Sequence, residues 1–495
     1  MENEQKPNIL FILTDQHKLD AMGCYRDTPC RTPNLDRLAE TGVRFETAYT
    51  ACPVCSPTRS TIMTGLYPHQ HGMCCNVEDL GCSVHELVDR PALLTRRLQD
   101  AGYRCGYTGK WHLGSDREEF YGLENEPTLP RNVGFEGQQF PGHGGGGFEY
   151  PEYNDYLAQH GWEHEVIPQH DRPFHAWNYG MLKGPVESTV PCFLARHTNA
   201  LIDRFRAAGD PFFIWHSFWG PHSPYFIPRQ FYEMYRDVEI PEWPNYRWDA
   251  RALNRPHQVK LHTHADDLTW DDWAEAVRYY YGFTTLIDQQ IGGILRHLEK
   301  RGLRDNTIII FAADHGETLG THGGLTDKGW HHFEEIQRVP FIVWMPERYY
   351  GNGVRPGDAL HEWISLVDLY PSILDVAGAH VEEEELPGRS IWPLFDGGSV
   401  EWRDQVFVEF FGVNSLVTTM ASVRKGNFKY GWNCSSHDDL YDLGADPHEM
   451  HNLIDEPPYG AVVSEMRGLL EEWMGETAFP GLGYYRRTRM DKWPY

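Results

Sequence analysis

The sequence predicts an α/β protein in which a large, mainly parallel or mixed sheet is sandwiched by helices. Apolar runs of strand length recur along the chain, and segments with helical periodicity separate them. Runs that are apolar at every position indicate strands covered on both faces. After about residue 400 the sequence pattern changes to short, closely spaced runs typical of strands. This pattern predicts a smaller antiparallel sheet followed by a helix.

The predicted elements follow one another along the chain. The strands of the large sheet are expected over residues 8–13, 103–108, 211–216 and 307–311. The helices between them are expected over residues 32–39, 91–99 and 273–301. The last and longest of these helices is amphipathic and stops at Gly302, a residue suited to a helix C-terminus. The C-terminal strands are expected over residues 406–411, 420–423, 428–431 and 440–443, and the final helix over 461–474.

This change of sequence pattern predicts an α/β domain over residues 1–398 and an α+β subdomain over 399–495. Two stretches, at about 115–195 and 225–270, interrupt the first domain. The former holds a run of four glycines after His143, and the latter holds tryptophans 243, 248 and 270. Long segments of this kind are usually functional. We expect pocket walls, with surface decoration as the alternative. The glycine run lacks the Lys and Ser/Thr of a phosphate-binding loop and is expected to be a flexible loop.

Composition limits the partners and the compartment. The formal net charge is −27, which disfavours nucleic acid, anionic membranes and, less strongly, long polyanionic substrates. The N-terminus carries two acids, and its apolar run is too short for a signal sequence. Since no stretch reaches the roughly 18 apolar residues of a membrane span, we expect a cytoplasmic protein without a membrane partner. Its ten cysteines are therefore expected to be packed thiols rather than disulfides.

The segment Cys55-Ser56-Pro57-Thr58-Arg59 places a nucleophile, a turn-forming proline and a fixed cation within five residues. It resembles the C-x-P-x-R signature of the type I sulfatases, which belong to the alkaline phosphatase superfamily. The resemblance implies an alkaline phosphatase-like fold and oxidation of Cys55 to formylglycine (3-oxoalanine), an aldehyde whose hydrate attacks sulfur. It further implies a bacterial enzyme that a formylglycine-generating maturation enzyme modifies in the cytoplasm.

A metal site is expected at the carboxyl ends of two predicted strands. Asp15 ends the first strand, and Asp314 and His315 end the strand near residue 313. Ligands bind at this edge of open α/β sheets, so two acids far apart in sequence can meet at one cation. The Asp314-His315-Gly-Glu segment also resembles a metal motif of the sulfatases, and Gln16 stands where that family often has a second acid. With Cys55, these residues imply one divalent ion. Calcium is expected first, and manganese or magnesium are the alternatives because His315 offers nitrogen.

The resemblance also supplies the remaining catalytic groups. Lys110 and His112 lie in a G-K-W-H-L-G segment, His222 in P-H-x-P, and Lys328 downstream of the metal motif. Arg59 would hold the oxygens of the nucleophile, and Lys110 would bind those oxygens and the sulfate. His222 and Lys328 would bind the sulfate and stabilise or protonate the leaving oxygen. His112 would then deprotonate the second hydroxyl at residue 55, so that sulfate leaves and the aldehyde returns.

Other interpretations stay open at this point. Cys52 and Cys55 form a C-x-x-C that also suits redox or zinc chemistry, and each histidine suits a structural role. Phosphonate monoester hydrolases and phosphodiesterases of the same superfamily share the fold, the formylglycine and the Asp-His pair. They carry uncharged hydroxyl residues at the positions of Lys110 and His112, so these two residues favour sulfate. A non-catalytic relative would be expected to have lost the nucleophile or a metal acid. A sulfated mono- or oligosaccharide is the expected substrate, followed by small aryl or alkyl sulfates.

Overall fold

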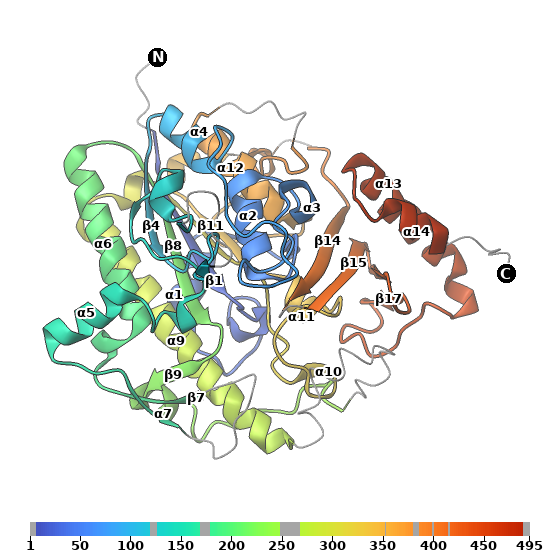
Figure 1. The fold of residues 1–495 in the computed structure, drawn as a ribbon, viewed down its shortest axis with the longest axis horizontal. Helices are drawn as coiled ribbons and strands as arrows, with labels where there is room; N and C mark the ends of the chain where they lie inside the picture. Colours follow the sequence, from blue (N-terminus) through green and yellow to red (C-terminus); the bar gives the residue numbers. More distant parts are fainter. Residues whose placement is uncertain are drawn as a thin grey trace.

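The computed structural model describes residues 6–118, 126–168, 179–247, 268–351, 353–379, 386–397, 400–413 and 416–488. Trp248 of the second predicted pocket wall lies outside these residues. Figure 1 shows a central sheet with helices in front of and behind it, and a C-terminal unit at one end.

The main sheet has eight strands and mixed direction. Their spatial order is β12 (Ala359–Leu360), β2 (Val43–Phe45), β11 (Phe341–Trp344), β10 (Thr307–Ala313), β1 (Asn8–Asp15), β8 (Phe212–Pro221), β4 (Arg104–Gly109) and β5 (Glu136–Gly137). The five strands β10, β1, β8, β4 and β5 are parallel to one another, and β11 pairs antiparallel with both β10 and β2. The predicted mainly parallel or mixed sheet is confirmed.

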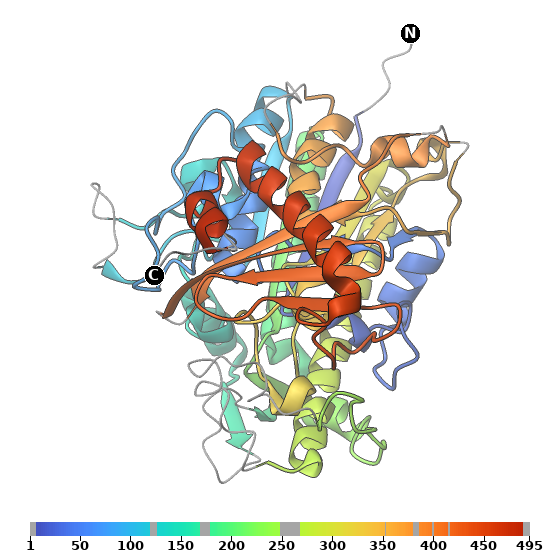
Figure 2. The ribbon, with the colours of Figure 1, turned by 90° about the vertical axis from the view of Figure 1, so that its right-hand side faces the viewer.

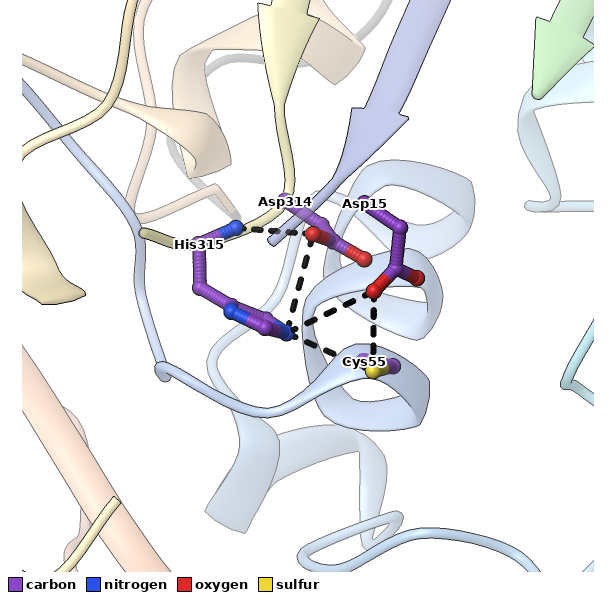
Figure 3. A group of neighbouring side chains, drawn as sticks. All are labelled: Asp15, Cys55, Asp314 and His315. Atoms are coloured by element: carbon purple, nitrogen blue, oxygen red, sulfur yellow. Dashed lines mark hydrogen bonds and ion pairs between the residues drawn. The ribbon is translucent and has the colours of Figure 1, made fainter. Parts of the chain in front are cut away.

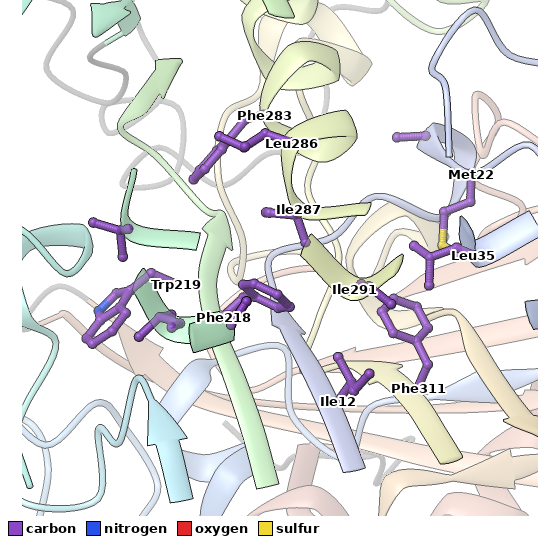
Figure 4. Packing of buried hydrophobic residues seen from close by; sticks show 14 of the residues in the cluster. Ile12, Met22, Leu35, Phe218, Trp219, Phe283, Leu286, Ile287, Ile291 and Phe311 are labelled. Atoms are coloured by element: carbon purple, nitrogen blue, oxygen red, sulfur yellow. The ribbon is translucent and has the colours of Figure 1, made fainter. Parts of the chain in front are cut away.

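The two faces of β1 pack into two separate hydrophobic clusters. Leu10 and Ile12 belong to one cluster, and Ile9, Phe11 and Leu13 belong to the other. This alternation explains why the strand is apolar at every position, since both faces are covered. Figure 4 shows one face, where Ile12 and other side chains of the sheet meet residues of the long helix.

Helices of two groups cover the sheet. The face that includes Ile12 packs against α1 (Pro33–Glu40), α5 (Pro151–His160), α6 (Val190–Ala208), α7 (Arg229–Glu233) and α9 (Trp270–Lys300). The opposite face packs against α2 (Cys55–Thr64), α4 (Leu94–Asp100) and α12 (Leu369–Val376). The short helices are α3 (Pro68–His71), α10 (Thr321–Gly324) and α11 (Glu334–Gln337). Figure 1 shows α6 and α9 together on one side of the sheet.

The C-terminal part forms the predicted antiparallel sheet. Its order is β14 (Gln405–Val413), β15 (Leu416–Lys425), β16 (Phe428–Asn433) and β17 (Asp439–Asp442), followed by α13 (Gly460–Glu476) and α14 (Leu482–Thr488). Figure 2 shows α13 lying across these strands. A domain boundary at residues 398 and 399 stays a prediction.

The stretch predicted as a first insert contains more regular structure than its composition suggested. It includes α5, the edge strand β5, and the paired strands β6 (Glu165–Pro168) and β7 (Tyr179–Lys183). These two strands form a small sheet with β9 (Tyr225–Pro228), which lies at the start of the second stretch. The last residues of the first stretch form the start of α6, with Pro191 in the first turn, where proline is tolerated. The predicted helix over residues 91–99 begins only at Leu94. A pair of very short strands, β3 (Ala48–Tyr49) and β13 (Ile364–Ser365), lies beside the main sheet.

Two expectations from composition can be compared with the structure. All ten cysteines are free thiols, as predicted. Within the described residues, no helix combines the length and the apolar character that crossing a membrane requires.

Candidate active site

Two neighbouring strands of the main sheet bring the predicted metal ligands together. β1 and β10 are parallel and paired, with Thr14 opposite Ala313. Asp15 is the last residue of β1, and Asp314 and His315 follow β10, so all three side chains lie at the carboxyl edge of the sheet. Figure 3 shows them converging just beyond the two strand ends, with Cys55 completing the group.

Asp15, Cys55, Asp314 and His315 each offer one donor atom, and these atoms all lie within 4.8 Å of one another. Cys55 Sγ is 3.3 Å from His315 Nε2 and 3.6 Å from Asp15 Oδ1. His315 Nε2 is 3.7 Å from Asp314 Oδ1 and 4.0 Å from Asp15 Oδ1. All four residues are fully buried. A buried group of two carboxylates, an imidazole and a thiol is a donor set that fits a divalent cation.

Cys55 is the first residue of α2 and is held by a tight preceding turn. Thr58 donates a hydrogen bond to the Cys52 carbonyl, and its hydroxyl also bonds Thr50. Cys52 itself points into a small apolar cluster with Trp330. The two cysteines of the C-x-x-C therefore have different surroundings, and Cys55 alone lies among the metal donors.

Arg59 and Lys110 neutralise the carboxylates. Arg59 Nη2 lies 2.9 Å from Asp15 Oδ2 and 3.1 Å from Asp314 Oδ2. Lys110 Nζ lies 2.6 Å from Asp15 Oδ2. Burial opposes ionisation of Asp15, but Lys110 and Arg59 hold the pKa of its carboxyl well below its usual value. The site therefore concentrates positive charge around the nucleophile, where a sulfate would bring negative charge.

Gly109 allows Lys110 to approach the site. Its φ is +97°, and a Cβ at this position would lie only 1.8 Å from the Ser217 carbonyl oxygen. The end of β4 can therefore lie against β8, and the backbone N–H of Lys110 donates to that same carbonyl at 3.1 Å. Arg59 Nη1 also holds this end of β4 in place by donating a hydrogen bond to the Lys110 carbonyl at 2.9 Å.

His222 and Lys328 form a pair on another side of the site. His222 Nδ1 donates to the Ser223 carbonyl at 2.6 Å, so that Nε2 accepts from Lys328 Nζ at 2.9 Å. Burial and the lysine charge lower the pKa of His222 to about 3. Burial also disfavours the charge of Lys328, but Asp327 and other nearby anionic groups raise the pKa of this lysine. In this arrangement Lys328 carries the proton and His222 is neutral.

Gln16 lies beside the four donors and is engaged by two other residues. Its carbonyl oxygen accepts a hydrogen bond from Lys328 at 2.9 Å, and its amide donates to Glu317. Glu317 also accepts from the backbone N–H groups of Leu319 and Asp327, at 2.9 and 2.8 Å. The structure thus places Gln16 as a link between the metal group and Lys328, and its role as a metal ligand stays a prediction.

His112 completes the predicted set and has a partner that the motifs did not indicate. Its Nε2 lies 2.5 Å from Glu78 Oε2. Burial opposes protonation of His112, but Glu78 raises the pKa of the imidazole. His143, from the glycine-rich stretch, lies between two predicted catalytic rings, with centroids 5.2 Å from His112 and 5.0 Å from His222. Sequence reasoning named neither Glu78 nor His143 as a site residue, because no motif marks them.

Comparisons with known proteins agree with this geometry. The sulfatase family model matches residues 7–379, and a model described as N-sulphoglucosamine sulphohydrolase, C-terminal, matches residues 320–476. An uncharacterized sulfatase of Escherichia coli (strain K12), YidJ, is 29% identical over 99% of this chain and 92% of its own length. N-acetylglucosamine-6-O-sulfatase of Bacteroides thetaiotaomicron is 26% identical over 95% of this chain and 87% of its own. The phosphonate monoester hydrolase structure of Agrobacterium radiobacter has a TM-score of 0.79 and 26% identity, covering 95% of this chain and 96% of that chain.

Proposed function

Because this chain belongs to the sulfatase family and is a sulfuric ester hydrolase, we propose that it hydrolyses a sulfate ester of a mono- or oligosaccharide with a formylglycine hydrate made from Cys55. The observation that carries the proposal is the position of Cys55. Among the residues that the structure describes, it is the only cysteine in a group of buried metal donors, and Arg59 and Lys110 bind the carboxylates of that group. A maturation enzyme that oxidises the thiol is the partner this chemistry requires.

Calcium is the ion we propose for the four donors. Two of the donors are carboxylates, and the hydrate of a formylglycine at residue 55 would add oxygen, the ligand atom that calcium prefers. His315 supplies nitrogen, which manganese accepts more readily than calcium does. When bound, the ion supplies positive charge that favours an ionised nucleophile.

The chain's own residues divide the remaining work. Arg59 and Lys110 are buried and contact Asp15, so they would bind the oxygens of residue 55 and of the sulfate. Lys328 carries a proton that its hydrogen bond shares with His222. These two residues would hydrogen-bond the leaving oxygen and deliver its proton. His112 would remove a proton at residue 55 in the step that releases sulfate.

The carbohydrate part of the proposal depends on one relative and on one wall of the site. The relative from Bacteroides thetaiotaomicron is named for a sulfated amino sugar. In this chain, Gly142 accepts a hydrogen bond from the backbone of His112, and the half-buried ring of His143 lies between His112 and His222. These contacts support a role for the glycine-rich stretch as one wall of the site, in which the His143 imidazole would hydrogen-bond a sugar hydroxyl beside the ester.

Two tryptophans of the second stretch, Trp243 and Trp270, lie within the described residues. Trp243 packs against Trp270 and donates from its indole N–H to the Leu319 carbonyl at 2.8 Å. Tyr246 also packs against Trp270. These rings brace the segment that leads from Glu317 to Lys328. Stacking of a sugar on this stretch stays a proposal.

Phosphonate monoester hydrolysis is the second candidate, favoured by the similarity to the Agrobacterium radiobacter structure. Against it, the two residues that favour sulfate are both held in the site by a carboxylate. Lys110 contacts Asp15, and His112 contacts Glu78. A panel of substrates separates the two candidates. Matured enzyme should cleave a sulfated sugar or an aryl sulfate with higher kcat/KM than a phosphonate monoester.

The deciding experiment compares Cys55→Ala with Cys52→Ala after co-expression with a formylglycine-generating enzyme. Cys52 is equally buried and three residues away, so it controls for damage to the turn. Mass spectrometry of the peptide should show the aldehyde at residue 55 in the wild type and in Cys52→Ala. Turnover should disappear only in Cys55→Ala. In the wild type, a chelator should abolish turnover, and adding calcium or manganese afterwards should restore it. Near-normal turnover by Cys55→Ala would rule the proposal out.

A further inference from the structure

A carboxylate that belongs to none of the recognised motifs lies against a predicted catalytic histidine. Glu78 Oε2 is 2.5 Å from His112 Nε2, and the His112 side chain is 1% exposed while that of Glu78 is 21% exposed. An ionised carboxylate only accepts hydrogen bonds, so the proton between the two groups belongs to Nε2. In the neutral imidazole, Nδ1 is then the nitrogen with the free lone pair.

The second ring nitrogen of His112, Nδ1, is buried and has no hydrogen-bond partner within the part of the chain that the structure describes. Cys55 is one of the groups that interact with the ring. A buried acceptor without a partner is costly in a folded protein unless something else uses it. The geometry therefore leaves Nδ1 available to a hydroxyl on residue 55.

The segment that carries Glu78 is attached to the helix of the nucleophile. The backbone N–H of Ser56 donates to Asn76 Oδ1 at 3.1 Å, and Val77 N–H donates to Ser56 Oγ at 3.3 Å. Val77 is fully buried. Since Ser56 follows Cys55 directly, the position of Glu78 relative to residue 55 is fixed by two short connections rather than by a free loop.

We propose that Glu78 is a positioning residue that holds His112 with Nε2 protonated and Nδ1 directed at residue 55. The inference rests on the proposed sulfatase function. In the release step His112 Nδ1 takes the proton of the second hydroxyl on residue 55. The O–H electron pair becomes the carbonyl bond, and the bond from that carbon to the sulfate oxygen breaks, so that sulfate departs. The Glu78 carboxylate faces the imidazolium that results, as a carboxylate does in a nucleophile–histidine–acid triad.

Kinetics of Glu78→Gln test the proposal, with Glu86→Gln as the matched control. Glu86 lies in the same segment, but its carboxylate accepts from the backbone N–H groups of Ser115 and Thr128 and touches no predicted catalytic residue. Slower sulfate release lowers kcat and KM by the same factor and leaves kcat/KM unchanged. We expect kcat of Glu78→Gln to fall about 10- to 100-fold, part of what a positioned base contributes. A burst of alcohol, stoichiometric with enzyme, should precede the steady state.

A double variant separates positioning from general damage. In a His112→Gln background, Glu78→Gln should cost no further activity, because the residue it orients is gone. An equal further loss, a fall of kcat/KM in step with kcat, or an unchanged kcat in the single variant would each overturn the proposal. A wild-type enzyme that is matured yet cleaves no sulfate ester would instead refute the proposed function.

A second measurement needs no turnover. Nitrogen-15 spectra of histidine-labelled, unmatured protein, with His112 assigned by its loss in His112→Gln, report which ring nitrogen carries the proton. The wild type and Glu86→Gln should show His112 protonated on Nε2. Glu78→Gln should show a mixture of tautomers or the other one. The same Nε2 tautomer in Glu78→Gln, at full occupancy, would mean that Glu78 does not set it.

Discussion

His216 provides a quantitative test of how burial in the sheet is linked to pH. This histidine lies on β8 and is fully buried, and its Nδ1 is 2.6 Å from the Thr198 hydroxyl of α6. Its Nε2 has no hydrogen-bond partner in the described part of the chain. Burial therefore lowers the pKa of His216 from the usual 6.5 to about 3.

The sign of the effect follows from the lowered pKa. The unfolded chain binds a proton at His216 below pH 6.5, whereas the folded chain does so only near pH 3. The stability that neutral His216 allows is thus present above pH 6.5 and is lost as the pH falls toward 3. At pH 5 the loss is about 2 kcal/mol, because each pH unit within the window counts for about 1.4 kcal/mol.

Urea unfolding at pH 7.5 and pH 5 measures this loss. His216→Asn keeps a polar atom near Thr198 but does not titrate. The difference in the free energy of unfolding between pH 7.5 and pH 5 should therefore be about 2 kcal/mol smaller in this variant than in the wild type. His361→Asn is the control, because His361 is exposed. An identical pH dependence in wild type and His216→Asn would refute the reasoning.

Three further predictions concern the metal, the leaving group and a helix start. Asp314→Asn keeps an oxygen for the backbone N–H of His315 but removes a charge, so calorimetry should show calcium affinity lowered at least about 10-fold. His222→Gln should lower kcat/KM more for an alkyl sulfate than for nitrophenyl sulfate, because a good leaving group needs little protonation. Asp288→Ala should destabilise the fold by about 2–4 kcal/mol in urea, because Asp288 accepts from backbone N–H groups of Asn34 and Leu35 in the first turn of α1.

The metal donors and most of the sheet were predictable because each depends on a local pattern. The runs that form β1, β8 and β10 are apolar on both faces, so the strands and their carboxyl ends could be placed. Parallel pairing then brings the residues after those ends together, as Asp15 and Asp314 show. The family resemblance added the roles, and the structure places every predicted site residue at or beside this edge.

The parts that sequence reasoning missed depend on tertiary contacts. β2 and β12 have three and two residues, too few for any periodicity. They form because β2 pairs with β11 on one side and with β12 on the other. The start of α6 carries Pro191 within a glycine- and proline-rich context that hides it. Glu78 reaches His112 across 34 positions of sequence, and only the fold brings the two together.

The distribution of charge in the site bears on which sulfate esters suit it. The chain has 71 acidic and 44 basic residues, yet Arg59, Lys110 and Lys328 are buried together at the end of β1 and β10. An acidic surface repels a polyanion within a Debye length of about 8 Å at physiological salt, whereas a single sulfate that enters the site meets three cations. The net charge of −27 would work against a polymer that brings many sulfates to the protein at once. The charge pattern therefore favours small substrates with one or few sulfates, in agreement with a carbohydrate monomer or short oligomer.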